Sequence, residues 1–157
     1  MIFIPGNIPS LKNSKVMTRR GIFPSPTVTK WLRSIGIQDF NSSKNKKSVK
    51  GYVDPERFNQ FERLRPQWEN MMHGKEYPIA IGFHQVRNSK RLYDFGNSVE
   101  LLQDLLTAHD FIVDDNVSYV FPVPMTKDGK LINEYNIRTE KWYSVDKENP
   151  GCFIKIF

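Results

Sequence analysis

The succession of two hydrophobic periodicities in the middle of the chain constrains its fold most. Residues 77–87 alternate between apolar and other side chains, the pattern of a β-strand with one face in a core. Residues 95–109 then carry apolar side chains at the spacing of an amphipathic helix. Residues 117–123 predict another strand, and Pro122 and Pro124 confine its end to a sheet edge. The apolar positions of the first strand and of the helix include Ile79, Ile81, Phe83, Val99, Leu101, Leu102, Leu105 and Leu106.

The segments on both sides of this unit predict shorter elements. A loop rich in Pro, Gly, Asn, Ser and Lys precedes Pro26, and a polar, basic loop covers about residues 37–53. Pro66 is expected to kink or split the helix that contains it. Together these elements indicate an α+β fold, in which a mixed or antiparallel sheet has helices packed on one face. The further elements are a strand at residues 1–5, helices that begin at Ser25-Pro26 and at Asp54-Pro55, a turn at Lys127–Lys130, extended segments near Trp142–Val145 and Cys152–Phe157, and a turn at Asn149–Gly151.

Length and composition restrict the class of protein. The chain has 157 residues, of which 39% are hydrophobic and 25% charged, and this favours one folded domain over disorder. Its single cysteine, Cys152, cannot form an intrachain disulfide, as expected in a reducing compartment. The apolar run at the amino terminus is too short for a signal peptide, and no run is long enough to span a membrane. We therefore expect a single cytoplasmic domain over residues 1–157, with no membrane partner and a basic insertion at about 37–75.

Positive charge is concentrated in the first third of the chain. Residues 1–51 contain ten Lys or Arg and one acid, Asp39, so this segment carries +9 and the remainder −3 of the net charge of +6. A basic region of this kind favours a polyanion such as nucleic acid as the partner. The lysines between Lys44 and Lys50, taken alone, are instead typical of a solvated loop.

Three groups of acidic residues surround the helix predicted at residues 95–109. Each group has an ordinary explanation alone: Asp94 as a helix cap, Glu100 and Asp104 as exposed helix residues, and Asp114-Asp115 as part of a turn. Together they occupy 22 positions, and we expect the strand and helix to bring the helix start and the later turn close together. Carboxylates that converge in this way suit Mg²⁺, which can activate water for hydrolysis of a phosphodiester. No catalytic triad, zinc-ligand spacing or glycine-rich phosphate loop offers a rival chemistry.

This pattern resembles the RusA family of Holliday-junction resolvases. The family motif has an Asp-x-Asp-Asn at a helix start, a Lys four residues after the second Asp, an Asp-Ala-Leu within the helix, and a later Asp-Asp pair. Asp94 and Asn97 fall on the first element, Asp104 on the helix element and Asp114-Asp115 on the last, without a gap. The segment Ile4–Lys15 also looks like the family's amino-terminal Pro-x-Pro-Ser-x-Asn signature. The resemblance covers roughly residues 1–20 and 77–120.

Two positions depart from the family pattern. Gly96 stands where the family has its second metal-binding Asp, and Glu100 stands where it has the Lys. Either the site has decayed, or Glu100, one helical turn after Gly96, restores the third carboxylate by leaning toward the helix N-terminus. The positive charge would then come from another residue, and the candidates are Lys12, Lys15, Lys90 and Arg91.

The resemblance implies a homodimeric endonuclease that uses Mg²⁺ or Mn²⁺ to cut branched DNA, in particular four-way junctions. The alternative is a catalytically impaired DNA-binding protein of the same fold. The implied catalytic and metal-binding residues are Asp94, Glu100 and Asp115, with Asp114 as a further ligand, Asn97 and Asp104 in support, and Lys12, Lys15, Arg19, Arg20, Lys90 and Arg91 as DNA-binding residues.

Overall fold

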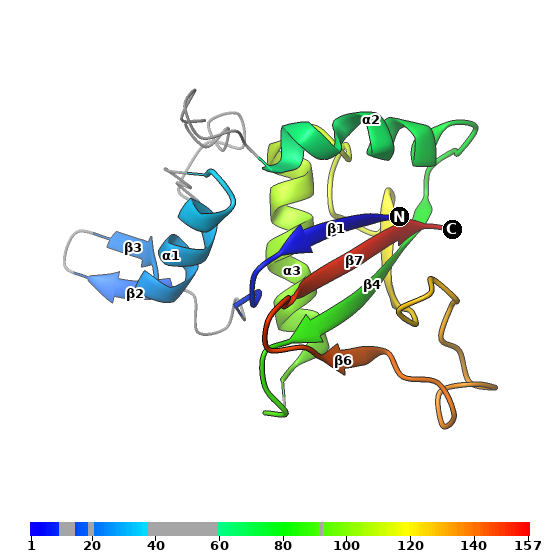
Figure 1. Ribbon diagram of the computed structural model, residues 1–157. Coiled ribbons are helices and arrows are strands. Elements are labelled where there is room, and N and C mark those ends of the chain that lie inside the picture. The colour runs from blue at the N-terminus through cyan, green and yellow to red at the C-terminus, as the bar shows by residue number, and fades with distance from the viewer. Residues whose placement is uncertain (10–14, 19–20, 38–59, 92) are drawn as a thin grey trace.

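The computed structural model describes residues 1–9, 15–18, 21–37, 60–91 and 93–157. Its main sheet contains five strands in the order β1-β7-β4-β5, with β6 also paired to β4 (Figure 1). β7 is antiparallel to β1 and β4, whereas β5 and β6 are parallel to β4. The α+β class and the mixed sheet are therefore confirmed. The strands are β1 (Ile2–Pro5), β4 (Ile79–Arg87), β5 (Val120–Pro124), β6 (Tyr143–Val145) and β7 (Gly151–Ile156).

A separate hairpin stands where the sequence predicted only a loop. β2 (Lys15–Thr18) and β3 (Gly21–Pro24) pair in antiparallel orientation. The prediction was wrong here because the polar and turn-forming residues around these strands obscured two short runs of β-forming residues. The charged segment at 38–59, including the expected helix start at Asp54-Pro55, lies outside the described residues.

Helix α1 (Pro26–Ser34) begins as predicted and packs on the segment that follows β1. The Ser25 hydroxyl caps it by accepting a hydrogen bond from the Val28 N–H at 3.4 Å. The Trp31 indole donates to the Pro5 carbonyl at 3.2 Å. Gly6 has φ +95°, and a Cβ there would lie 2.8 Å from the Trp31 ring. Glycine is thus required for the turn and for this close approach.

Helix α2 (Gln60–Met72) continues through Pro66, so the expected split does not occur. Pro66 is exposed, and water can therefore reach the backbone carbonyl that loses its helical donor. The buried side of α2 carries Trp68, whose indole donates to the Phe111 carbonyl at 2.8 Å and whose ring meets the Phe111 ring edge-on. α2 is thereby fixed to the segment after α3.

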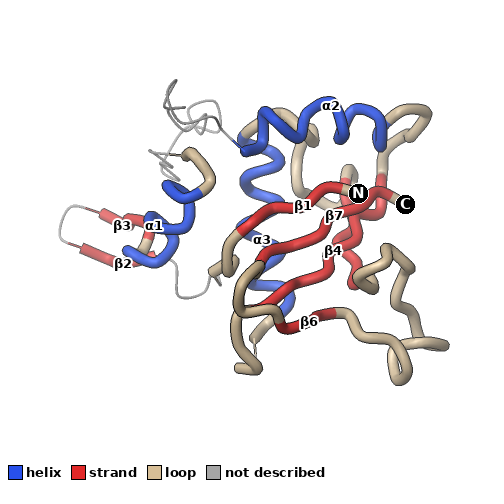
Figure 2. Tube along the Cα trace, viewed as in Figure 1, coloured by secondary structure: helices blue, strands red, loops and turns tan. Residues whose placement is uncertain are grey.

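Helix α3 (Phe95–Ala108) packs on one face of the sheet and fills the core (Figure 2). The strand register places Ile81 opposite Ile156 and Phe83 opposite Ile154, and all four side chains are buried. Leu102 and Leu106 of α3 are fully buried in the same cluster. The alternation predicted for β4 therefore places its large apolar residues toward the core, as expected.

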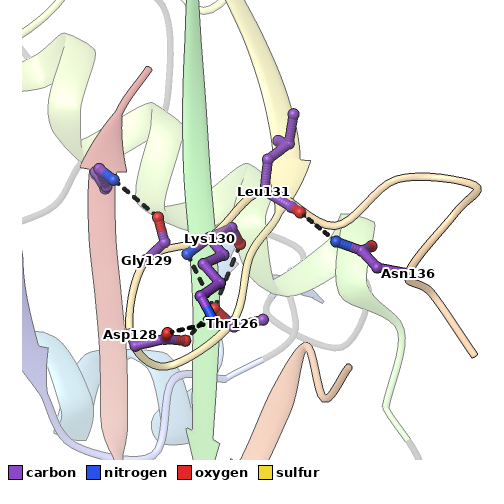
Figure 3. A network of polar contacts seen from close by, with 7 residues as sticks. Thr126, Asp128, Gly129, Lys130, Leu131 and Asn136 are labelled. Atoms are coloured by element: carbon purple, nitrogen blue, oxygen red, sulfur yellow. Dashed lines mark hydrogen bonds and ion pairs between the residues drawn. The ribbon is translucent and has the colours of Figure 1, made fainter. Parts of the chain in front are cut away.

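The opposite face of β4 is covered as well, by the loop at residues 125–131. Figure 3 shows the polar contacts of this loop, in which Lys130 N–H donates to the Thr126 hydroxyl at 2.9 Å and Lys155 donates to the Gly129 carbonyl at 2.8 Å. Gly129 has φ +79°, as the predicted turn requires. The His84 imidazole lies 3.0 Å from the Met125 carbonyl. β4 is consequently buried on both faces, although its sequence alternation predicted only one.

β5 is an edge strand whose outer side offers no free backbone N–H. The Met125 N–H points inward to the Phe83 carbonyl, so the N–H positions of residues 120, 122 and 124 point outward. The Val120 N–H is bonded to the Asn116 carbonyl, and Pro122 and Pro124 have none. The edge position predicted from these prolines is confirmed, and they block extension of the sheet.

None of the described helices is long and apolar enough to cross a membrane.

Candidate functional site

The start of α3 presents Asp94 to solvent as the helix cap. Its carboxylate accepts the Asn97 backbone N–H at 3.4 Å and the Asn97 side-chain amide at 2.8 Å. The side chain is exposed, so one face of the carboxylate remains open to another ligand. Asp94 thus serves as a cap and remains available for a second task.

The two positions that depart from the family pattern are both exposed on α3. A Cβ at Gly96 would have Asp94 Oδ1 as its nearest neighbour, at 3.5 Å, which is an ordinary contact. The backbone at position 96 therefore leaves room for the Cβ of another residue beside Asp94. Glu100 lies one turn further along the helix, where helical side chains lean back toward position 96.

The other acidic residues lie further along α3 and beyond its end. Asp104 is half-buried on the third turn of the helix. The Asp114 carboxylate accepts the Asp115 N–H at 2.8 Å and the Asn116 side-chain amide at 2.9 Å. Through these hydrogen bonds Asp114 stabilises the turn that leads into β5.

The topology keeps the two groups of carboxylates apart within one chain. β4 and β5 are parallel, so α3 leaves the carboxyl end of β4 and returns to the amino end of β5. Its 14 residues span about 21 Å at 1.5 Å per residue. Asp94 and Asp115 therefore lie at opposite ends of α3, and the expected convergence is wrong for a single protomer. Accordingly, no group of three or more His, Cys, Asp or Glu side chains suited to a metal ion occurs among the described residues.

The predicted DNA-binding residues divide between the described and the undescribed parts of the chain. Lys90 and Arg91 are exposed immediately before Asp94. Lys15 belongs to β2. The remaining residues, Lys12, Arg19 and Arg20, lie outside the described residues.

An aromatic group beside the α3 start was not predicted from the sequence. The Trp142 ring lies 6.0 Å from Tyr93, 5.6 Å from Phe95 and 5.8 Å from Tyr143, between ring centroids. The Arg87 guanidinium lies 4.8 Å from the centroid of the Tyr93 ring. These residues meet because β6 pairs with the end of β4, with Tyr143 opposite Gln85. The only signal in the sequence was that two aromatics flank Asp94.

Cys152 and His84 are unsuited to nucleophilic catalysis. Complete burial raises the pKa of the Cys152 thiol well above its usual range, which disfavours the reactive thiolate. Burial lowers the pKa of His84, whose second ring nitrogen lies 3.0 Å from the Ser144 hydroxyl. His84 therefore acts as a neutral bridge between the 125–131 loop and β6.

Comparison with known proteins found no match to this chain among protein-family models, curated proteins or solved structures.

Proposed function

We propose that this chain is a divalent-metal-dependent endonuclease that cuts branched DNA as a homodimer. The observation that carries the proposal is the α3 start, where Asp94 is fixed by two hydrogen bonds yet exposed. Exposed Glu100 lies on the same helix, and Lys90 and Arg91 precede Asp94. Hard oxygen ligands beside cations suit a site that holds Mg²⁺ or Mn²⁺ against a phosphodiester.

Because Asp94 and Asp115 lie far apart within one chain, the proposal requires a dimer in which two copies share each metal site. If both residues serve one metal site, one of them has to come from a second copy of the chain. A two-fold dimer would then contain two equivalent sites, which suits paired cuts in a junction of two-fold symmetry. Asp94 and Glu100 of one copy, with Asp115 and Asp114 of the other, would hold the ion.

The chemistry divides between the ion and the residues of the chain. A bound Mg²⁺ would lower the pKa of water and neutralise the charge that develops on the phosphate. Asn97 holds the Asp94 carboxylate in place through its side-chain amide. Lys90 and Arg91 would attract the DNA backbone to this end of α3.

A second candidate is a DNA-binding protein of this fold that does not cut. It is favoured by Gly96, which stands where the family has one of its metal-binding carboxylates. In this case the same basic residues would bind DNA, and the acids would act only as caps and turns.

A labelled four-way junction distinguishes the candidates. The protein is incubated with the junction in Mg²⁺, in Mn²⁺ and in EDTA, with a linear duplex of the same arm sequence as the control. Paired cuts in the junction that require the ion support the endonuclease. Binding without cuts in either ion supports the second candidate, and failure to bind the junction contradicts both.

A further inference from the structure

Arg87 is a half-buried cation, and in the part of the chain that the structure describes not all of its guanidinium N–H groups donate a hydrogen bond. It lies at the carboxyl end of β4 and donates from Nη1 to the Ile8 carbonyl at 3.3 Å. Its guanidinium lies over the Tyr93 ring. The Arg87 Nε is buried and has no hydrogen-bond partner among the described residues, and none of their carboxylates pairs with it. Such a group costs free energy unless another interaction offsets its burial.

Arg65 provides a comparison within the same molecule. Its guanidinium also lies over an aromatic ring, 4.7 Å from the centroid of Phe111, and also donates to a carbonyl, that of His109, at 2.8 Å. It differs in that Glu62 accepts two hydrogen bonds from it, both at 2.9 Å. The hydrogen bonds to Glu62 raise the pKa of Arg65, whereas burial lowers the pKa of Arg87. The two arginines share one arrangement, but within the described residues Arg87 has no carboxylate partner of the kind that Glu62 provides for Arg65.

Arg87 is only half-buried, which leaves part of its side chain accessible to an anionic ligand. Two further buried polar atoms without a hydrogen-bond partner in the described part of the chain, Gln85 Nε2 and the Tyr93 hydroxyl, belong to the same end of β4 and to the segment that follows it. Phosphate supplies the acceptors that a guanidinium fork and neighbouring donors need.

We propose that Arg87 binds a phosphate group, and that this phosphate belongs to the DNA backbone next to Asp94. The assignment of the phosphate to DNA rests on the proposed function. The Arg87 guanidinium lies over the ring of Tyr93, and Tyr93 immediately precedes Asp94, the proposed metal ligand at the start of α3. Arg87 then binds one phosphate per protomer, and the DNA anion offsets the burial of its charge.

The test compares Arg87→Met with Arg65→Met in the full chain. Met keeps an apolar stem over the ring and removes the charge. Junction binding is measured by fluorescence anisotropy in EDTA, so that cutting plays no part, over a series of salt concentrations. We expect Arg87→Met to bind the junction roughly tenfold more weakly than wild type. The plot of log K against log salt should also become less steep, by about 0.9 for each phosphate that is no longer neutralised. Arg65→Met should keep the wild-type slope.

Thermal unfolding separates binding from a structural role. Without DNA, Arg87→Met should melt no lower than wild type, because it removes a partly buried charge that no carboxylate of the described residues neutralises, whereas Arg65→Met removes an ion pair and should melt lower. Inorganic phosphate should stabilise wild type more than Arg87→Met. A wild-type salt slope in Arg87→Met overturns the proposal. Stabilisation by phosphate without any junction binding would keep the phosphate site but refute DNA as its source, and with it the proposed function.

A measurement on the wild type covers the case in which Arg87→Met does not fold. The NMR signal of the Arg87 Nε–H, assigned by its disappearance in Arg87→Lys, should move when the junction is added. The Arg65 Nε–H signal should stay in place. An Arg87 signal that does not move overturns the proposal.

Discussion

Two substitutions at Asp94 separate its role as a cap from its role as a metal ligand. Asparagine caps helices about as well as aspartate, but alanine cannot accept the Asn97 N–H. That bond is long, at 3.4 Å, so we expect Asp94→Ala to lose about 0.5–1 kcal/mol of unfolding free energy, in the lower part of the usual range for caps. For a domain of this size the loss corresponds to about 1–3 °C in Tm. Asp94→Asn should stay within a few tenths of a kcal/mol of wild type.

The assays for this prediction are urea unfolding and junction cleavage in Mg²⁺. Both variants should lose cleavage, because neither supplies a carboxylate to the ion, while both should still bind the junction in EDTA. Wild-type cleavage by Asp94→Asn would show that the residue is only a cap. Equal destabilisation by Asn and Ala would refute the argument from the hydrogen bond.

Three further predictions test the packing, the buried histidine and the altered motif. Gly151→Ala should cost at least about 1–3 kcal/mol in urea unfolding, since a Cβ there would lie 2.5 Å from the Ile4 carbonyl oxygen, and a wild-type midpoint would refute this packing. The pKa of His84 is lowered in the folded chain, so the unfolded chain binds the proton more readily. The contribution of His84 to the free energy of unfolding is therefore complete above about pH 6.5 and declines as the pH falls below that value. Urea titrations from pH 5 to 8 should show a smaller decline in His84→Gln, and an equal decline would contradict the assignment. If Glu100 supplies the third carboxylate, Glu100→Gln should reduce junction cleavage by roughly 10²-fold or more. The double variant Gly96→Asp with Glu100→Lys should then cleave the junction as well. If the site has decayed, the wild type should be inactive and only the double variant should cleave.

The elements around α3 were predictable because their signals are local. The cap at Asp94, the apolar stripe of the helix and the alternation in β4 each depend on residues close in the sequence. The prolines of β5 likewise identified an edge from the chemistry of two residues, because proline has no N–H to donate. These are the predictions that the structure confirms.

The arrangement of the candidate site was less predictable because it depends on strand direction. The spacing of Asp94 and Asp115 in the sequence is the same whether β5 runs parallel or antiparallel to β4. Only the parallel pairing shows that α3 runs between them and places them at its opposite ends. The packing of Trp142 against Tyr93 depends in turn on the pairing of β6 with β4, in which Gln85 lies opposite Tyr143, 58 positions further along the chain.

Mixing two inactive variants tests the central claim, a metal site shared by two copies, most directly. Asp94→Asn and Asp115→Asn should each fail to cut a four-way junction in Mg²⁺. When the two proteins are unfolded and refolded together, half of the dimers contain one chain of each kind, and each mixed dimer has one site with both carboxylates intact. We therefore expect roughly a quarter of the wild-type nicking rate to return. If the mixture stays inactive while the two chains demonstrably form mixed dimers, the shared site is contradicted.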